Sequence, residues 1–114
     1  MDGLEWVKEF PGAVTVCDAE GRIVEMNEKS REVFAADGGA KLLGANVLDC
    51  HPEPSRSRLK AMMDDRRENV YTIQKNGRKK LIYQTPWYKD GAYAGFVELS
   101  LEIAWDLPHF NRDR

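Results

Sequence analysis

Two hydrophobic periods divide the chain, and each predicts a different kind of element. Apolar and polar residues alternate in five segments: 14–16, 24–26, 69–75, 79–88 and 93–103. This period of two predicts β-strands, and the intervening turns "DAEG", "NGR" and "KDGA" predict that neighbouring strands pair as hairpins. Between the two groups of strands, Leu59, Met62 and Met63 recur at helical spacing, which predicts one amphipathic helix.

The beginning of the chain has the pattern of a short cap helix that ends at the "PG" pair. Asp2 and Glu5 have the spacing of a capping box, in which each side chain satisfies a backbone N–H at the helix start. One apolar face of this helix is formed by Leu4, Val7 and Phe10. Such a face needs another surface to cover.

The middle of the chain is helical by the same criteria. Asn27 follows the second strand and suits a helix N-cap, because its side chain can accept from the free N–H groups of "EKSREVF". The order is therefore helix, two strands, short helices, one longer helix and three strands. It predicts an α+β fold with a five-stranded antiparallel sheet and helices grouped over one face.

Composition limits the function classes. The 114 residues suit one domain, and 17 basic against 19 acidic residues give a net charge of −2. That balance argues against a nucleic-acid-binding face, and no apolar run is long enough to span a membrane. With only Cys17 and Cys50, no disulfide framework is implied, and we expect a reducing, cytoplasmic setting.

The stretch "NVLDCHPEPSR" places Asp49, Cys50 and His51 side by side. Adjacent residues of an extended loop point apart, so the thiol and the imidazole are poorly placed to activate each other. No paired metal-ligand spacing is present either. The prolines that follow fit a helix entry, which Ser55 or Ser57 can cap. We therefore expect that the protein is not an enzyme and that this stretch is a loop leading into a helix.

Two long segments, "VTVCDAEGRIVEMNEKSREVF" and "GRKKLIYQTPWYKDGAYAGFVELSLEI", resemble the PAS sensor domain in content and order. The resemblance covers roughly Phe10 to Ile103 and implies a sheet of order 2-1-5-4-3 around a small pocket, with sensing and dimerisation as the usual roles. "DCHPEPS" and "YQTPWYKDG" further resemble the PAS module that accompanies hemerythrin-like iron domains in some bacterial proteins. The domains expected are a cap helix at 1–10, a PAS-like domain at 11–104 and a tail or linker at 105–114.

The resemblance does not name a cofactor. Haem-binding PAS domains ligate iron with a histidine on the helix before the third strand, and His51, the only histidine of that region, precedes that helix. Light-sensing flavin domains carry a cysteine in a "GxNCRFLQ" pattern, but "GANVLDCH" places Val47 at that position. Flavin photochemistry is not expected, and haem and flavin both lack a supporting motif.

The resemblance also implies a ligand site. Glu98 falls where flavin-binding relatives place a pocket glutamine, and a charged group there would be disfavoured by desolvation. A solvated glutamate on an amphipathic strand is the alternative. The residues expected to line the pocket are Phe34, Leu48, Met62, Thr72, Ile82, Gln84 and Glu98.

The opposite face of the sheet is the expected interaction surface. If it is apolar, it forms a patch too large to leave in water, which the cap helix or a second subunit would cover. The residues expected at the dimer interface, from this face and from the cap helix, are Leu4, Val7, Phe10, Tyr83, Trp87, Leu99 and Leu101. Two functions remain open: a module that senses a small molecule and signals to an effector domain or protein through its last strand and tail, or a ligand-free dimerisation module.

Overall fold

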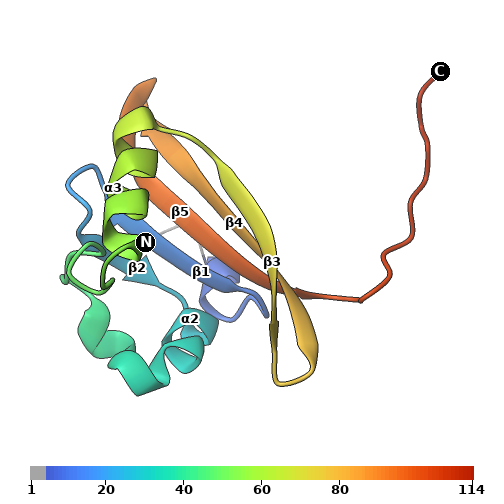
Figure 1. Cartoon of the computed structure of the whole chain (residues 1–114), viewed down its shortest axis with the longest axis horizontal. Coiled ribbons are helices and arrows are strands. Elements are labelled where there is room, and N and C mark those ends of the chain that lie inside the picture. The colour runs from blue at the N-terminus through green and yellow to red at the C-terminus, as the bar shows by residue number, and fades with distance from the viewer. Residues whose placement is uncertain (1–4) are drawn as a thin grey trace.

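The computed structural model describes residues 5–114 and contains one antiparallel sheet with helices over one face (Figure 1). In chain order the elements are α1 (Glu5–Lys8), β1 (Ala13–Asp18), β2 (Ile23–Met26), α2 (Glu28–Val33), η1 (Ala35–Asp37), η2 (Gly39–Leu42), α3 (Ser55–Asp65), β3 (Asn69–Lys75), β4 (Arg78–Lys89) and β5 (Ala92–Ile103). The strand order is β2-β1-β5-β4-β3. The predicted fold class and strand order are confirmed.

Two tight turns fix the pairing of the last three strands. Asn76 and Gly77 join β3 to β4, and Asp90 and Gly91 join β4 to β5, all four with positive φ. Two successive residues in this conformation twist a hairpin in the direction that the flanking strands prefer, and Asn-Gly and Asp-Gly adopt it most readily. The turns therefore align the residues next to them, and a bulge between Trp87 and Tyr88 then shifts the register of the β4–β5 pair.

Asn27 ties the N-terminal half together. Its side-chain oxygen accepts from the N–H groups of Ser30, at 3.0 Å, and Val14, at 2.9 Å, so it caps α2 as predicted. Its amide nitrogen donates to the carbonyls of Val7, at 3.0 Å, and Gly12, at 2.9 Å. One side chain, only 3% exposed, thus joins α1, β1 and α2.

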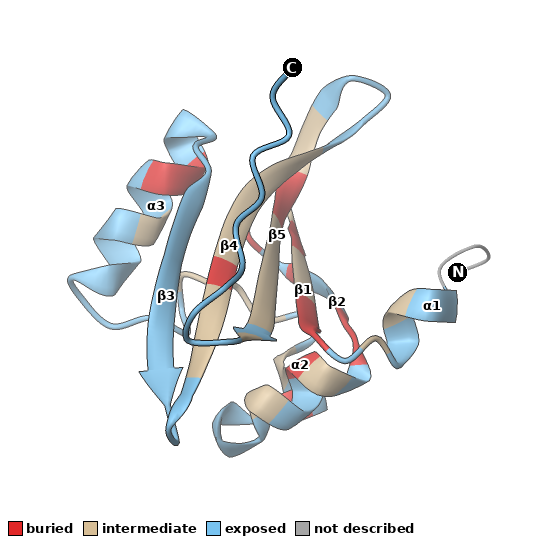
Figure 2. Ribbon diagram, turned by 90° about the vertical axis from the view of Figure 1, so that its right-hand side faces the viewer, coloured by how far each residue is buried: buried red, intermediate tan, exposed pale blue. Residues whose placement is uncertain are grey.

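The helix-covered face of the sheet holds the tightest packing. Met62 and Met63 of α3 pack with Cys17 and Phe96, which pair with each other across β1 and β5. Burial falls off toward the other edge, where β3 is exposed along its whole length (Figure 2). The core therefore sits under α3 and α2, and the β3–β4 hairpin extends beyond it.

Within the described residues α1 is a single turn that ends at Lys8, before the expected end at Phe10. Phe10, just after α1, lies near Leu101 of the uncovered sheet face, since a Cβ at Gly12 would crowd both side chains. The predicted capping residue Asp2 and apolar residue Leu4 lie outside the described residues.

Beyond β5, residues 104–114 leave the sheet as an extended tail (Figure 1). Its first aromatic, Trp105, stays close to the β3–β4 hairpin: its indole N–H donates to the Gly77 carbonyl at 3.4 Å, and the Lys79 ammonium donates to the Trp105 carbonyl at 3.5 Å. The root of the tail is thus held at the hairpin. In residues 5–114, no helix has the length and apolar character needed to cross a membrane.

Candidate functional site

A row of polar side chains crosses the helix-covered face of the sheet. Glu98 on the central strand β5 pairs with Thr15 on β1 and with Gln84 on β4, and Gln84 pairs with Asn69 on β3. Paired residues of an antiparallel sheet point to the same face. The rows on either side include apolar Phe96 and Ile82, so the polar row is an interruption in an otherwise apolar floor.

Two hollows lie between this floor and the helical segments. The larger, about 370 Å³, is lined by Thr15, Ile23, Met26, Phe34, Asp37, Leu42, Val47, Cys50, His51 and Glu98. The smaller, about 60 Å³, is lined by Thr15, Cys17, Val47, His51, Leu59, Met62, Met63, Gln84, Phe96, Val97 and Glu98. Because both lists contain Thr15, Val47, His51 and Glu98, the hollows adjoin, and those four residues form their shared boundary. The combined volume falls in the range of small-molecule pockets.

Glu98 is the acidic group at this boundary. Burial raises the pKa of its carboxyl, and the nearby His51 and the Gln84 amide offset part of that effect. Gln84 is oriented by Asn69, whose amide donates to the Gln84 oxygen at 3.0 Å and so leaves the Gln84 N–H₂ group for the carboxylate. Among the described residues, Glu98 forms no ion pair with a lysine, arginine or histidine. Its charge is only partly compensated.

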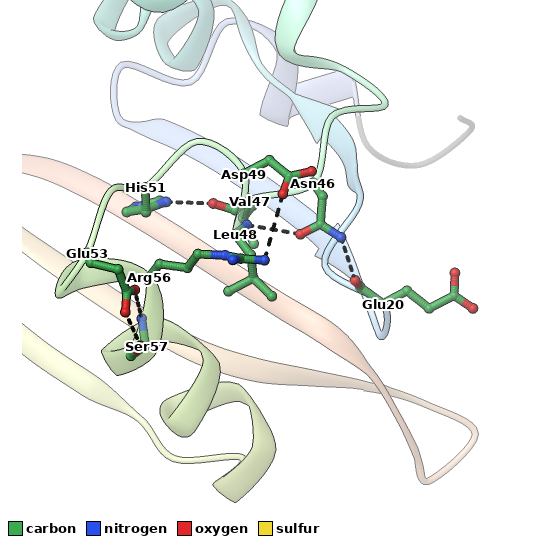
Figure 3. A network of polar contacts seen from close by, with 9 residues as sticks. All are labelled: Glu20, Asn46, Val47, Leu48, Asp49, His51, Glu53, Arg56 and Ser57. Atoms are coloured by element: carbon green, nitrogen blue, oxygen red, sulfur yellow. Dashed lines mark hydrogen bonds and ion pairs between the residues drawn. The ribbon is translucent and has the colours of Figure 1, made fainter.

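The loop before α3 supplies the rim (Figure 3). Asn46 organises it: its side-chain oxygen accepts from the Leu48 N–H at 2.9 Å, and its amide donates to the Glu20 carbonyl at 3.0 Å. His51 Nδ1 lies 2.6 Å from the Val47 carbonyl. Because a carbonyl only accepts, Nδ1 carries the proton, and Nε2 remains for another partner.

The loop leads into α3, as predicted, but the group that caps the helix differs. No side chain caps the helix from the N-cap position, which Pro54 occupies. Instead the Glu53 carboxylate accepts from both the backbone N–H and the hydroxyl of Ser57 (Figure 3). The prediction that Ser55 or Ser57 caps the helix is therefore wrong, because the acid of "HPEPS" takes that role.

A sequence profile of the PAS fold matches residues 7–104, most of the chain. The chain belongs to the PAS family. No curated protein sequence matches it. The resemblance seen in the sequence is thus confirmed at the level of the family.

Solved structures share this fold at low sequence identity. The PAS domain of BvgS from Bordetella pertussis superposes with a TM-score of 0.61 at 22% identity, covering 91% of this chain and 88% of that one. The Aer2 receptor of Vibrio cholerae, described as a dual PAS-heme oxygen sensor, gives 0.63 at 17%, covering 82% and 95%. A C-terminal domain from Streptococcus mutans gives 0.69 at 17%, covering 84% and 78%. At such identities the likeness concerns the fold alone.

Four of the predicted pocket residues line the hollows of this PAS domain: Phe34, Met62, Gln84 and Glu98. Ile82 lies on the same sheet face and is buried, without lining either hollow. Leu48 lines a separate hollow together with Lys60 and Tyr93, because the turn made by Asn46 places Val47 at the pocket instead. These placements locate the side chains, while ligand binding by them stays a prediction.

The register contradicts one predicted position. Thr72 pairs with Leu81, which pairs with Leu101, so Thr72 lies on the opposite face from Glu98. Tyr71, which pairs with Ile82, lies on the helix-covered face in its place. Across the Asn-Gly turn the two numbers of a pair add to an odd sum, so an even-numbered residue of β3 cannot share a face with an even-numbered residue of β4.

Sequence reasoning missed several residues that line the hollows, among them Thr15, Cys17, Val47, Cys50 and Met63. Thr15 could have been found by extending the register from Glu98 to β1. Val47 lies in a segment without periodicity, where the sequence offers no comparable signal.

The uncovered face carries the residues proposed for an interface. Tyr83, Trp87, Leu99 and Leu101 of this face are all half-buried, and so are Val7 in α1 and Phe10 just after it. Trp87 on β4 already has an intramolecular partner: its indole N–H donates to the Cys17 carbonyl of β1 at 3.0 Å. The side chain reaches β1 across β5 at Gly95, the residue that pairs with Trp87. A Cβ at Gly95 would collide with that same carbonyl. This surface is apolar, and whether a second chain covers it stays a prediction.

The described residues contain no group of three or more His, Cys, Asp or Glu side chains that could hold a metal ion. His51 is exposed and belongs to the loop rather than to α3, as its sequence position indicated. Cys17 is buried and Cys50 exposed, and both thiols are free.

Proposed function

We propose that this PAS domain is a sensory module that binds a small molecule in the two adjoining hollows. The observation that carries the proposal is the partly compensated carboxylate of Glu98 at the boundary of a mostly apolar space of ligand size. An apolar pocket with a few convergent polar groups and a perturbed ionisable residue is the usual form of a binding site. Solved relatives in a receptor and in sensor kinases agree with a sensing role.

The last strand provides a path from the pocket to the chain beyond the domain. Glu98 lies on β5, which continues to Ile103 and then to the tail held by Trp105 at the hairpin. A ligand that moves Glu98 would act on the strand bonded to both β1 and β4. The effector, whether a domain or a separate protein, would receive the change through the tail. We see no nucleophile–base arrangement among residues 5–114, so we propose binding rather than catalysis.

Native mass spectrometry of the purified chain tests this proposal. We expect a species heavier than the chain, whose extra mass is lost on denaturation or is gained from a small-molecule extract. Val47→Phe, which fills the shared boundary of the hollows, should lose that mass. Val24→Phe, an exposed position on β2, is the matched control and should retain it. A wild-type chain that neither retains nor gains mass would contradict the proposal.

The alternative is a dimerisation module whose hollows need no ligand. The half-buried apolar residues of the uncovered face support a homodimer, in which two copies bury Leu99 and Tyr83 against each other. Sedimentation velocity over a range of concentrations tests it. We expect Leu99→Lys to abolish a wild-type dimer and Lys89→Ala, at the exposed end of β4, to leave it intact. A wild-type chain that sediments as a monomer throughout would rule it out.

Two further points remain proposals. The resemblance to the PAS modules of hemerythrin-like bacterial proteins suggests where an effector would be sought, since such a domain would be joined in one chain or act as a partner. A reducing compartment such as the cytoplasm suits the exposed free thiol of Cys50.

A further inference from the structure

The two hollows have an unusual charge composition. Their described lining includes two carboxylates, Glu98 and Asp37, and no lysine or arginine. The only lining side chain that can become cationic is His51. An anionic ligand would therefore enter a space with acidic groups and no fixed positive charge to pair with, at a cost that burial increases.

The polar atoms at the boundary are mostly acceptors. The Glu98 carboxylate offers lone pairs, and a neutral His51 offers Nε2, because its Nδ1 proton is committed to the Val47 carbonyl. Thr15 shares its hydroxyl with Ser30, whose Oγ lies 2.5 Å away. A ligand group with several N–H donors satisfies these acceptors together, whereas another acceptor would leave them unpaired.

The remaining walls are apolar and soft. Every cysteine and methionine among residues 5–114 lines one of the two hollows: Cys17, Met26, Cys50, Met62 and Met63. Thioethers are flexible and make favourable contacts with aromatic rings, and Phe34 adds a ring to the larger hollow. Such walls accommodate a flat apolar body without demanding one shape.

We infer that the ligand class of this pocket is a small organic cation: a protonated amine on an apolar, preferably aromatic body, with the ammonium at Glu98 and the body in the larger hollow. The inference rests on the proposed function and specifies its chemistry. Burial of the Glu98 carboxyl without an ion pair raises its pKa, and a bound ammonium supplies the missing partner.

Three probes with one aromatic body and different head groups test the charge preference: 2-phenylethylamine, 2-phenylethanol and 3-phenylpropionate. Each is titrated into the full chain at neutral pH and followed by amide chemical shifts in two-dimensional NMR. We expect the amine to bind at least about tenfold more tightly than the alcohol, and the carboxylate most weakly. The shifts should centre on the residues that line the hollows.

Glu98→Gln removes the charge while keeping the shape of the side chain. We expect it to lower the affinity for the amine to about that for the alcohol and to leave the alcohol unchanged. Glu102→Gln is the matched control, because Glu102 lies on the same strand outside both hollows, paired with Arg78 at 3.2 Å. It should change none of the three affinities.

The possible failures are distinguishable. If the alcohol or the carboxylate binds as tightly as the amine, or if the mass retained in native spectra is an anionic or neutral compound, the cation preference is overturned and the proposed sensor function stands. If none of the probes shifts the residues lining the hollows, the cation preference is also overturned. The proposed function falls with it only when the native spectra show a bare chain as well.

Discussion

Asn27 and Glu98 are two polar side chains set among apolar neighbours, and they are treated in opposite ways. Asn27 has a partner for each side-chain atom: its oxygen accepts twice, and its nitrogen donates to two carbonyls. Glu98 has the Gln84 amide and the proximity of His51, but no ion pair within the described part of the chain. The first arrangement stabilises the fold, and the second leaves capacity for a ligand.

The difference teaches how to separate structural from functional polar groups in a small domain. A buried polar group that is fully hydrogen-bonded holds elements in place and has little left to offer. A partly compensated charge beside a hollow costs folding free energy, which is tolerated where the group has a further use. The contrast leads to predictions about stability, which differ in sign for the two residues.

The largest effect is expected for Asn27→Ala. It removes the cap of α2 and leaves the buried N–H of Val14 and the carbonyls of Val7 and Gly12 without that partner. A lost cap costs about 1 kcal/mol and each of the three unpaired groups at least about 1, so we expect the free energy of unfolding to fall by about 4 kcal/mol or more. Urea denaturation followed by circular dichroism measures it.

Asn46→Ala is the matched control for that variant. Asn46 also makes two side-chain bonds, but both lie within surface loops, to Leu48 and Glu20. A loss of about 1 kcal/mol is expected, because water can replace the missing amide. Equal losses for the two variants would show that the buried hydrogen bonds of Asn27 stabilise the fold no more than the surface bonds of Asn46.

Glu98→Gln should have the opposite sign at neutral pH. The folded-state pKa of Glu98 is raised above its unfolded value, so the folded protein binds more protons there, and the stability contributed by this group falls as pH rises through that raised pKa. Glutamine does not ionise, so the variant does not lose stability in this way as the pH rises. We expect it to be more stable than wild type at about pH 7 and closely similar at about pH 4, where a free glutamate is half protonated.

The measurement is urea denaturation of both proteins across that pH range, with wild type stripped of any ligand. The His51 imidazole and the Tyr71 hydroxyl also lie near Glu98, and both are present in the variant, so the difference between the two curves isolates the carboxyl. Glu102→Gln, which breaks an exposed ion pair with Arg78, should cost no more than about 0.5 kcal/mol. A variant less stable than wild type at neutral pH would show that Glu98 is already well paired.

The strands of this domain were predictable because their signals are local. The alternation in 69–75 and the Asn-Gly turn after it define β3 within the segment itself, and the Asp-Gly turn begins the pairing of β4 with β5. A bulge between Trp87 and Tyr88 then shifts the register by one residue, so that Glu98 pairs with Gln84. Asn27 was predictable as a cap for the same reason. Its bonds to Val7 and Gly12 were not, because they depend on how the chain before β1 packs.

The pocket was only partly predictable, since its walls come from segments that meet in space without a periodic signal. Val47 and His51 lie in an irregular loop whose course depends on the Asn46 side chain. Thr72 was predicted in a register that was wrong by one residue, and a shift of one residue moves a side chain to the other face of a sheet. The resemblance to flavin-binding PAS domains placed Glu98 in the pocket, whereas its neighbours on other strands required the register.

The smallest effect separates two acids of the loop before α3. Glu53 accepts twice from Ser57, while the Asp49 carboxylate lies 3.9 Å from the Arg56 guanidinium, with both side chains largely exposed. We expect Glu53→Ala to lower the free energy of unfolding by about 1 kcal/mol through loss of a helix-start bond, and Asp49→Ala to change it by less than about 0.5. Ser55→Ala should be neutral as well. Thermal denaturation of the three variants measures this, and a larger cost for Ser55→Ala than for Glu53→Ala would restore the serine cap that the sequence suggested.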